Sequence, residues 1–209
     1  ALDCARAVSD AFMAAMAPLG LPQPPTMSVG LSIGHYHESL QDLLEWGRAA
    51  ERTAKKERNA LAVTLHTRSG GDDSVGVCQS WDQRPLDRWK RWVDWYRRDA
   101  LPDGVVYELR ELARELRDLA QEGRSDAAAS LAAVEAARIL KRKKGQRGTR
   151  PLQESEIATI MDDLTGDAAM PLCRLEMMVN EMIVARHFAR AQDIAAGRLD
   201  EAGSADNEQ

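Results

Sequence analysis

The chain has 209 residues, of which 44% are hydrophobic and 29% are charged, and its net charge at pH 7 is −5. This composition is typical of a folded globular protein and excludes an intrinsically disordered chain. The negative net charge argues against a nucleic-acid binder that uses its whole surface and leaves only local basic patches for such contacts.

The cysteines and the apolar runs indicate a cytoplasmic protein. Cys4, Cys78 and Cys173 lie far apart and form no CxxC pair, which fits a reducing compartment and excludes a disulfide scaffold. No apolar run approaches the ~18 residues that a membrane-spanning helix needs. We therefore expect no contact with a membrane.

The first 80 residues are predicted to alternate helices and strands. In chain order, the predicted elements are a helix over 2–19, a strand over 27–35, a helix over 39–56 and a strand over 59–68. Ser39 can cap the second helix, and its buried face is predicted to hold Leu40, Leu43, Leu44 and Ala50. Strands separated by helices predict one sheet with helices against one face.

From Trp81 onward the pattern becomes helical throughout. Five stripes of apolar residues at helical spacing lie within 89–96, 105–119, 131–140, 157–164 and 172–186, which predicts an all-α bundle. In the third stripe the apolar positions are Leu131, Val134 and Leu140. The predicted fold class is therefore α+β, with a helix–strand–helix–strand part over 1–80, a helical bundle over 81–196 and a disordered tail over 197–209.

The sequence Gly70-Gly71-Asp72-Asp73 is typical of the metal-binding hairpin in palm-type nucleotidyl cyclases. Two adjacent carboxylates at a tight turn can hold Mg²⁺. The active hairpin needs apolar strands on both sides, whereas here Arg68, Ser69 and Ser74 flank the turn. Gly and Asp are also common turn residues for conformational reasons, so we interpret this segment as a surface hairpin turn.

His35 and His37 form a His-x-His pair that can bind a metal when it lies on a strand. Because no third cluster of ligands lies at motif spacing nearby, we interpret the pair as polar residues of a strand-to-helix loop and expect no metal site.

Two groups of basic residues have alternative interpretations. Lys55, Lys56 and Arg58 at the end of the second helix can stabilise the helix dipole or clamp a phosphate. The segment 138–150 has seven basic residues and no acidic one, which is typical of an RNA- or DNA-contacting loop and equally of a solvated loop. Trp89 and Trp92 are predicted to lie in the core, and Trp95 to face a partner.

Several of these features together resemble one family. Residues 27–71 contain an SxG strand, HY before a helix, an AExxAK helix end and RNALAVxLxxRSG. This combination resembles the last half of the palm domain in the large subunit of type III-B (Cmr) CRISPR effector complexes. The opening ALDCARAVSDAF resembles the helix that follows the catalytic GGDD hairpin there, and YELRELARELRD and EMMVNEMIVARHFA resemble segments of its C-terminal helical domain.

The resemblance implies a partial ferredoxin-like palm followed by the bundle. The family makes cyclic oligoadenylates from ATP, with Mg²⁺, when a target RNA pairs with the guide RNA. By resemblance, Lys55 contacts nucleotide phosphates, Arg58 is its companion, and Ser28 and Gly30 lie on the strand behind the nucleotide.

The same resemblance places the catalytic hairpin before residue 1, so we expect no catalytic residue in this chain and no activity from the chain alone. The expected partners are the upstream part of the same protein, other effector subunits, and guide and target RNA. Lys141, Arg142, Lys143 and Lys144 are the expected contacts to RNA or to another subunit. Two alternatives remain open: a fragment of a GGDEF-like diguanylate cyclase, and a non-catalytic helical interaction module.

Overall fold

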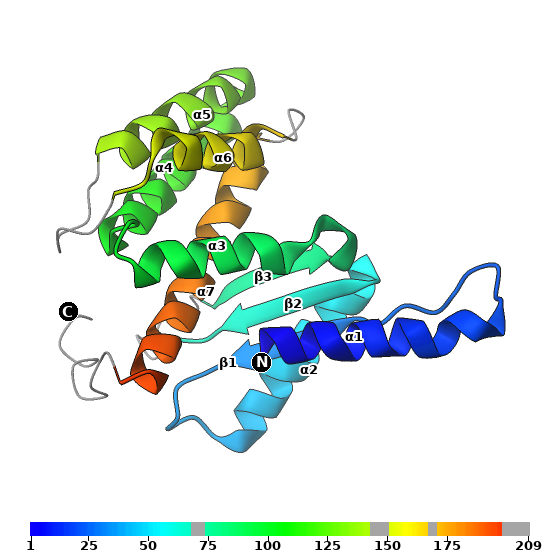
Figure 1. Cartoon of the computed structure of the whole chain (residues 1–209). Coiled ribbons are helices and arrows are strands. Elements are labelled where there is room, and N and C mark those ends of the chain that lie inside the picture. The colour runs from blue at the N-terminus through cyan, green and yellow to red at the C-terminus, as the bar shows by residue number, and fades with distance from the viewer. Residues whose placement is uncertain (68–73, 143–150, 167–170, 198–209) are drawn as a thin grey trace. The chain divides into compact units, whose positions relative to one another are not determined.

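The structure is a computed structural model that describes residues 1–67, 74–142, 151–166 and 171–197 (Figure 1). The chain divides into two compact units, Ala1–Trp89 and Lys90–Gln209. The division falls inside helix α3 (Pro85–Arg97), so this helix contributes to both units.

The first unit contains the predicted helix–strand–helix–strand order. Its elements are α1 (Leu2–Met16), a 3-10 turn η1 (Ala17–Leu19), β1 (Val29–Ile33), α2 (Leu40–Glu57), β2 (Ala60–Leu65), β3 (Val75–Ser80) and a second 3-10 turn η2 (Trp81–Gln83). The strand order is β1-β2-β3, with β1 parallel and β3 antiparallel to β2. The α+β class is confirmed, whereas β3 was not predicted.

Helix α2 begins where the sequence predicts. The Ser39 hydroxyl accepts a hydrogen bond from the backbone N–H of Asp42 at 3.1 Å, which satisfies one of the free N–H groups of the first turn. On the sheet side, Ala50 and Ala54 pack against Ala60 and Ala62 of β2. These small side chains let the helix lie close to the sheet.

The contact between α2 and β1 is closer still. A Cβ atom on Gly30 would lie 2.2 Å from the backbone nitrogen of Glu51 and 2.7 Å from the carbonyl carbon of Ala50. One strand position further on this face, the Ser32 hydroxyl donates to the carbonyl oxygen of Leu43 at 3.0 Å. The glycine is therefore required because the backbone of α2 occupies the space of a side chain.

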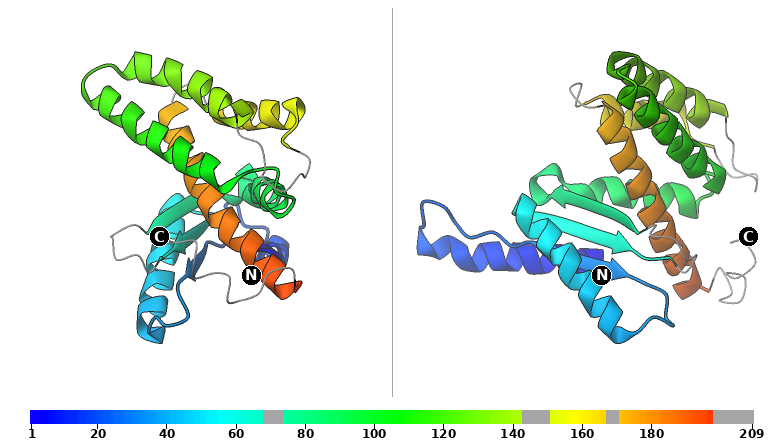
Figure 2. Two further views of the ribbon diagram at one scale, coloured as in Figure 1. Left: turned by 90° about the vertical axis from the view of Figure 1, so that its left-hand side faces the viewer. Right: turned by 180° about the vertical axis from the view of Figure 1, so that it is seen from behind.

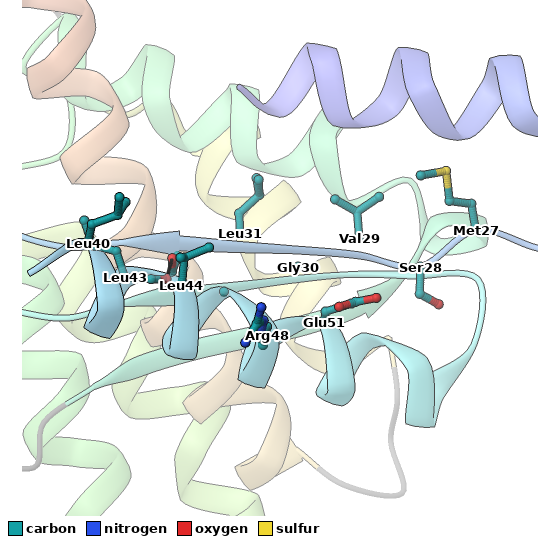
Figure 3. Close-up of a pocket in the computed structure, with 12 residues that line it drawn as sticks. Met27, Ser28, Val29, Gly30, Leu31, Leu40, Leu43, Leu44, Arg48 and Glu51 are labelled. Atoms are coloured by element: carbon teal, nitrogen blue, oxygen red, sulfur yellow. Dashed lines mark hydrogen bonds between the residues drawn. The ribbon is translucent and has the colours of Figure 1, made fainter.

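Helices lie on both faces of the sheet, which corrects the prediction of helices on one face. Val29 and Leu31 point to the side of β1 where α1 lies, and α2 lies on the opposite side (Figure 3). The side chain of Arg6 on α1 lies over the Trp81 ring, 5.5 Å from its centroid. Alternation along β1, with small residues on one face and aliphatic residues on the other, accounts for this two-sided packing.

Two leucines of α2 are exposed, contrary to the prediction. Leu40 is 74% and Leu44 52% exposed, because the residues that meet the sheet are mainly the small ones on the adjacent face of the helix.

The second unit is helical, as predicted. Besides the rest of α3 it contains α4 (Asp103–Gln121), α5 (Ser125–Arg142), α6 (Glu154–Thr165) and α7 (Pro171–Ala195). Helix α4 packs against α5 and α7, and α6 packs against α5 and α7. Figure 2 shows α4 and α5 as an antiparallel pair. Among the described helices, none combines the length and apolar character that a membrane crossing requires.

Of the three apolar positions predicted to be buried on helix α5, only Leu140 is buried. The buried residues of this helix are Ala128, Ala132, Ala136, Ile139 and Leu140. Leu131 is 43% and Val134 is 63% exposed. Alanines at a spacing of four residues let another helix approach closely, so the stripe of small residues takes the interior position.

Trp95 lies in the interior and does not face a partner, which corrects another prediction. It is 5% exposed, and its ring meets that of Trp92 edge-on with centroids 5.1 Å apart. The indole nitrogen of Trp92 donates to the carboxylate of the buried Glu181 at 3.2 Å. Met178 and Met182 on α7 are also buried, so neither of these two methionines forms an exposed face.

Replacing Gly30 by Ala tests the close contact of α2 with β1. We expect the free energy of unfolding to fall by about 1–3 kcal/mol, because the new Cβ would overlap backbone atoms that cannot rotate away. Gly76→Ala on β3 is the control, since its Cβ would meet no described atom closer than Thr64 Cγ2 at 3.9 Å. Urea denaturation followed by circular dichroism measures both, and equal effects would contradict the proposed contact.

Candidate functional site

A pocket of about 490 Å³ lies between β1 and α2 (Figure 3). Ser28 and Gly30, two of the four predicted nucleotide-binding residues, line it. From α2 its lining includes the exposed leucines Leu40 and Leu44. At the other end of the pocket the lining is charged, because Arg48 and Glu51 of α2 lie there.

The full lining of the pocket comes from two segments. These are Met27, Ser28, Val29, Gly30, Leu31 and Ser32 from β1 and the residue pair before it, and Leu40, Leu43, Leu44, Gly47, Arg48 and Glu51 from α2. Because β1 pairs only with β2 in the described sheet, this edge of the strand is open to the pocket.

Lys55 is connected to the pocket through Glu51. Its ammonium nitrogen lies 2.6 Å from the Glu51 carboxylate oxygen, one helical turn away, and both side chains are partly exposed. The hydrogen bond from Lys55 and its positive charge lower the pKa of Glu51, and Arg52 and Arg48 add to this effect. Glu51 is therefore ionised at neutral pH, and Lys55 is paired with a carboxylate.

Arg58 lies at the end of α2 in an unusual backbone conformation. Its φ is 58° and that of Asn59 is 45°, a region that non-glycine residues rarely adopt. The Arg58 N–H donates to the carbonyl of Ala54 at 3.0 Å, and the carbonyl of Asn59 accepts from the Trp81 N–H at 2.8 Å. The turn is thus held on both sides, while the Arg58 side chain is exposed and is not part of the pocket lining.

Gly30 has a packing function that the sequence interpretation did not include. The missing side chain makes room for α2, because the atoms closest to a Cβ there are backbone atoms of Ala50 and Glu51. Close approach of a nucleotide at Gly30 stays a prediction. The hydroxyl of Ser28 remains the candidate hydrogen-bonding group on this part of β1.

His35, Tyr36 and His37 form a small aromatic group after β1. The Tyr36 and His37 ring centroids are 4.0 Å apart, and the Nδ1 atom of His35 accepts a hydrogen bond from the His37 N–H at 3.2 Å. In the described part of the chain, no group of three or more His, Cys, Asp or Glu side chains is arranged to hold a metal ion. Residues 70–73 lie outside the described residues.

His66 and Trp46 form a stacked pair at the same end of the sheet, which the sequence analysis did not predict. The ring of His66, which follows β2, lies on the Trp46 ring of α2 with centroids 3.8 Å apart and 6° between the planes. Burial lowers the pKa of His66, and the nearby Glu38 carboxylate opposes this shift. Neutral His66 therefore contributes to the packing of α2 on the sheet.

Two of the predicted RNA- or subunit-contacting residues are described. Lys141 and Arg142 lie in the last turn of α5 and are exposed. The Arg142 guanidinium binds the Glu108 carboxylate of α4 at 2.5 Å. Lys143 and Lys144 lie outside the described residues.

The comparison with protein families gives a match for the first part of the chain. Residues 1–62 match the family model "Cas10/Cmr2, second palm domain". This segment is therefore similar to a Cas10/Cmr2 palm domain. The match covers α1, β1, α2 and the start of β2, so it includes Ser28, Gly30, Lys55 and Arg58.

The match confirms the resemblance to the large subunit for the palm part of the chain, and it is consistent with the C-terminal part of a Cas10/Cmr2 large subunit. The search of curated proteins and the search of solved structures each gave no match.

Removing the Lys55 charge should raise the pKa of Glu51 toward its ordinary value. The ion pair stabilises the ionised Glu51 carboxylate. Its contribution to the stability of the fold is therefore present above the ordinary pKa of Glu51 and is lost as the pH falls through the lowered pKa. We therefore expect Lys55→Ala to move the Glu51 titration, followed by carboxyl-carbon NMR, to higher pH.

Lys56→Ala is the matched control, because Lys56 lies about 100° around the helix from Lys55 and is not among the groups that shift Glu51. If Lys55→Ala left the titration unchanged, or both variants moved it equally, the specific ion pair would be contradicted.

Proposed function

We propose that this chain is part of the large subunit of a type III-B CRISPR effector complex, in which its palm segment helps to bind ATP for cyclic oligoadenylate synthesis. The observation that carries the proposal is the match of residues 1–62 to the Cas10/Cmr2 second palm domain. The same match favours this family over a GGDEF-like diguanylate cyclase and over a purely helical interaction module.

The arrangement of the candidate residues supports a phosphate contact by Lys55. Its partner Glu51 lines the same pocket as Ser28, and the Lys55–Glu51 distance of 2.6 Å puts the ammonium group beside that end of the pocket. An ammonium group binds phosphate oxygens as a mobile point charge. Arg58, three residues further along the chain, is the proposed second cation.

In this proposal ATP and Mg²⁺ are bound by the intact protein. Lys55, Arg58 and Ser28 supply contacts to the nucleotide, and the chain's own contribution is to bind and orient the phosphates. The guide and target RNA and the other effector subunits are the proposed partners in the cytoplasm.

The helical unit is proposed to dock neighbouring subunits. Because Trp95, Met178 and Met182 are buried, support for docking comes instead from the exposed side chains of Leu131 and Val134 on α5. Aliphatic residues at a spacing of three on an otherwise alanine-rich helix form an apolar surface that a partner could cover. Lys141 and Arg142 lie in the last turn of the same helix, and with Lys143 and Lys144 they are the proposed contacts to RNA or to another subunit.

Lys55→Ala in the intact protein should reduce oligoadenylate synthesis from ATP by roughly ten- to a hundredfold, the effect of losing one charge-assisted contact to phosphate. Lys56→Ala removes the same charge from the next position and should have a smaller effect. The rate of ATP conversion at limiting ATP measures both. Equal losses in the two variants would indicate general electrostatics and would contradict a specific phosphate contact.

The double variant Leu131→Gln, Val134→Gln should weaken assembly of the helical unit with the other effector subunits. Its unfolding free energy should change by less than about 0.5 kcal/mol per site, because both side chains are exposed. Co-purification of the subunits and urea denaturation measure the two effects. Glu115→Gln on the exposed face of α4 is the control, and assembly equal to that of the control would rule out this docking surface.

A further inference from the structure

The carboxylate of Glu51 binds the ammonium group of Lys55, which is the group proposed to bind a phosphate. The Lys55 nitrogen lies 2.6 Å from a Glu51 oxygen, which is the short contact typical of a charge-assisted hydrogen bond. Carboxylate and phosphate oxygens are alternative anionic partners of an ammonium group. The ammonium group has three N–H donors, but a phosphate that binds it competes with the Glu51 carboxylate for one positive charge, because the two anions repel each other.

Glu51 is held in place by its backbone, whereas Lys55 is free to turn. The backbone nitrogen and Cα of Glu51 lie 2.2 Å and 2.7 Å from the position that a Gly30 Cβ would take, so this turn of α2 is pressed against β1. The Glu51 side chain lines the pocket beside Ser28 (Figure 3). The side chain of Lys55 is 65% exposed and can exchange one partner for another by rotation.

The surrounding charges keep the competing group ionised. Lys55 and, more weakly, Arg52 and Arg48 hold the pKa of Glu51 below its usual value. Arg48 lines the pocket together with Glu51. Partial burial of the carboxylate opposes this shift of the pKa, but the net pKa of Glu51 is lowered, so Glu51 stays negative throughout the neutral pH range. The negative charge at this end of the pocket is thus permanent under physiological conditions.

We infer that Glu51 is a positioning residue that limits phosphate affinity: it holds Lys55 at the pocket in the free protein and must release it when a nucleotide triphosphate binds. The inference rests on the proposed phosphate contact of Lys55. In this inference Glu51 sets the nucleotide affinity of the site, and the triphosphate group is the part of the ligand whose binding Glu51 weakens. Loss of the carboxylate therefore strengthens binding.

The test is the affinity of the full chain, or of the intact protein that carries it, for magnesium-bound ATP and for inorganic tripolyphosphate, measured by isothermal titration calorimetry. Glu51→Gln keeps the size of the side chain and removes its charge. We expect it to tighten binding of both ligands by about two- to fivefold, the range that corresponds to an exposed ion pair. Glu45→Gln, an exposed position on the same helix, is the control and should change neither affinity.

A second pair of variants shows whether the effect of Glu51 on phosphate affinity depends on Lys55. In a Lys55→Ala background, Glu51→Gln should change affinity by less than about 1.5-fold at physiological salt, where screening weakens charges that are not in contact. An equal gain in both backgrounds, no gain in the wild-type background, or a gain for ATP but not for tripolyphosphate would each overturn the inference. If Lys55→Ala alone left ATP affinity unchanged, the proposed phosphate contact itself would be wrong.

Discussion

The close contact of α2 with β1 determines where the candidate nucleotide-binding side chains lie. Gly30 leaves no side chain between the two elements, so the backbone of α2 comes within van der Waals distance of the strand. Ser32 then binds the carbonyl of Leu43 across the same contact. These two interactions set the helix in one register along β1, and the same register brings Glu51, and through it Lys55, to the pocket.

The two units use small residues for the same physical purpose. In the first unit Gly30, Ala50 and Ala54 let a helix lie close to a sheet, and in the second unit the alanines of α5 face the interior of the bundle. Ion pairs add specific connections to the second unit: Arg91 of α3 binds Asp163 of α6 at 2.6 Å, and Arg97 binds Asp193 of α7 at 2.9 Å. Of the larger aliphatic side chains of α5, Ile139 and Leu140 are buried, whereas Leu131 and Val134 are left at the surface.

This use of small residues explains which sequence predictions succeeded. Helices and the first two strands followed from periodicity and from the cap at Ser39, because both signals are local. The buried faces of α2 and α5 were predicted only in part. Ala50 and Leu140 are buried as expected, whereas two leucines of α2 and two aliphatic residues of α5 are exposed, because large aliphatic residues were assumed to mark the interior. Strand β3 was missed because the last of its buried positions is the polar Gln79, and its other positions hold Gly76, Cys78 and Ser80, so the residue types do not show a half-buried strand.

The candidate site was predictable only in part. Lys55, Arg58, Ser28 and Gly30 came from resemblance to a family, and the family match includes all four positions. Lys55 and its partner Glu51 are only four residues apart in the sequence, yet the connection of this pair to the pocket depends on the register of α2 on β1. Trp95 was assigned to a partner surface because a stripe of tryptophans does not reveal how many neighbouring helices will surround it.

An experimental structure of the intact protein with ATP bound tests the central claim most directly. The account predicts that the Lys55 nitrogen lies within hydrogen-bonding distance of a phosphate oxygen and that its contact with Glu51 is broken or lengthened, while Gly30 still packs against the backbone of α2. A structure in which the phosphates lie away from Lys55, with the Lys55–Glu51 pair unchanged, would contradict it.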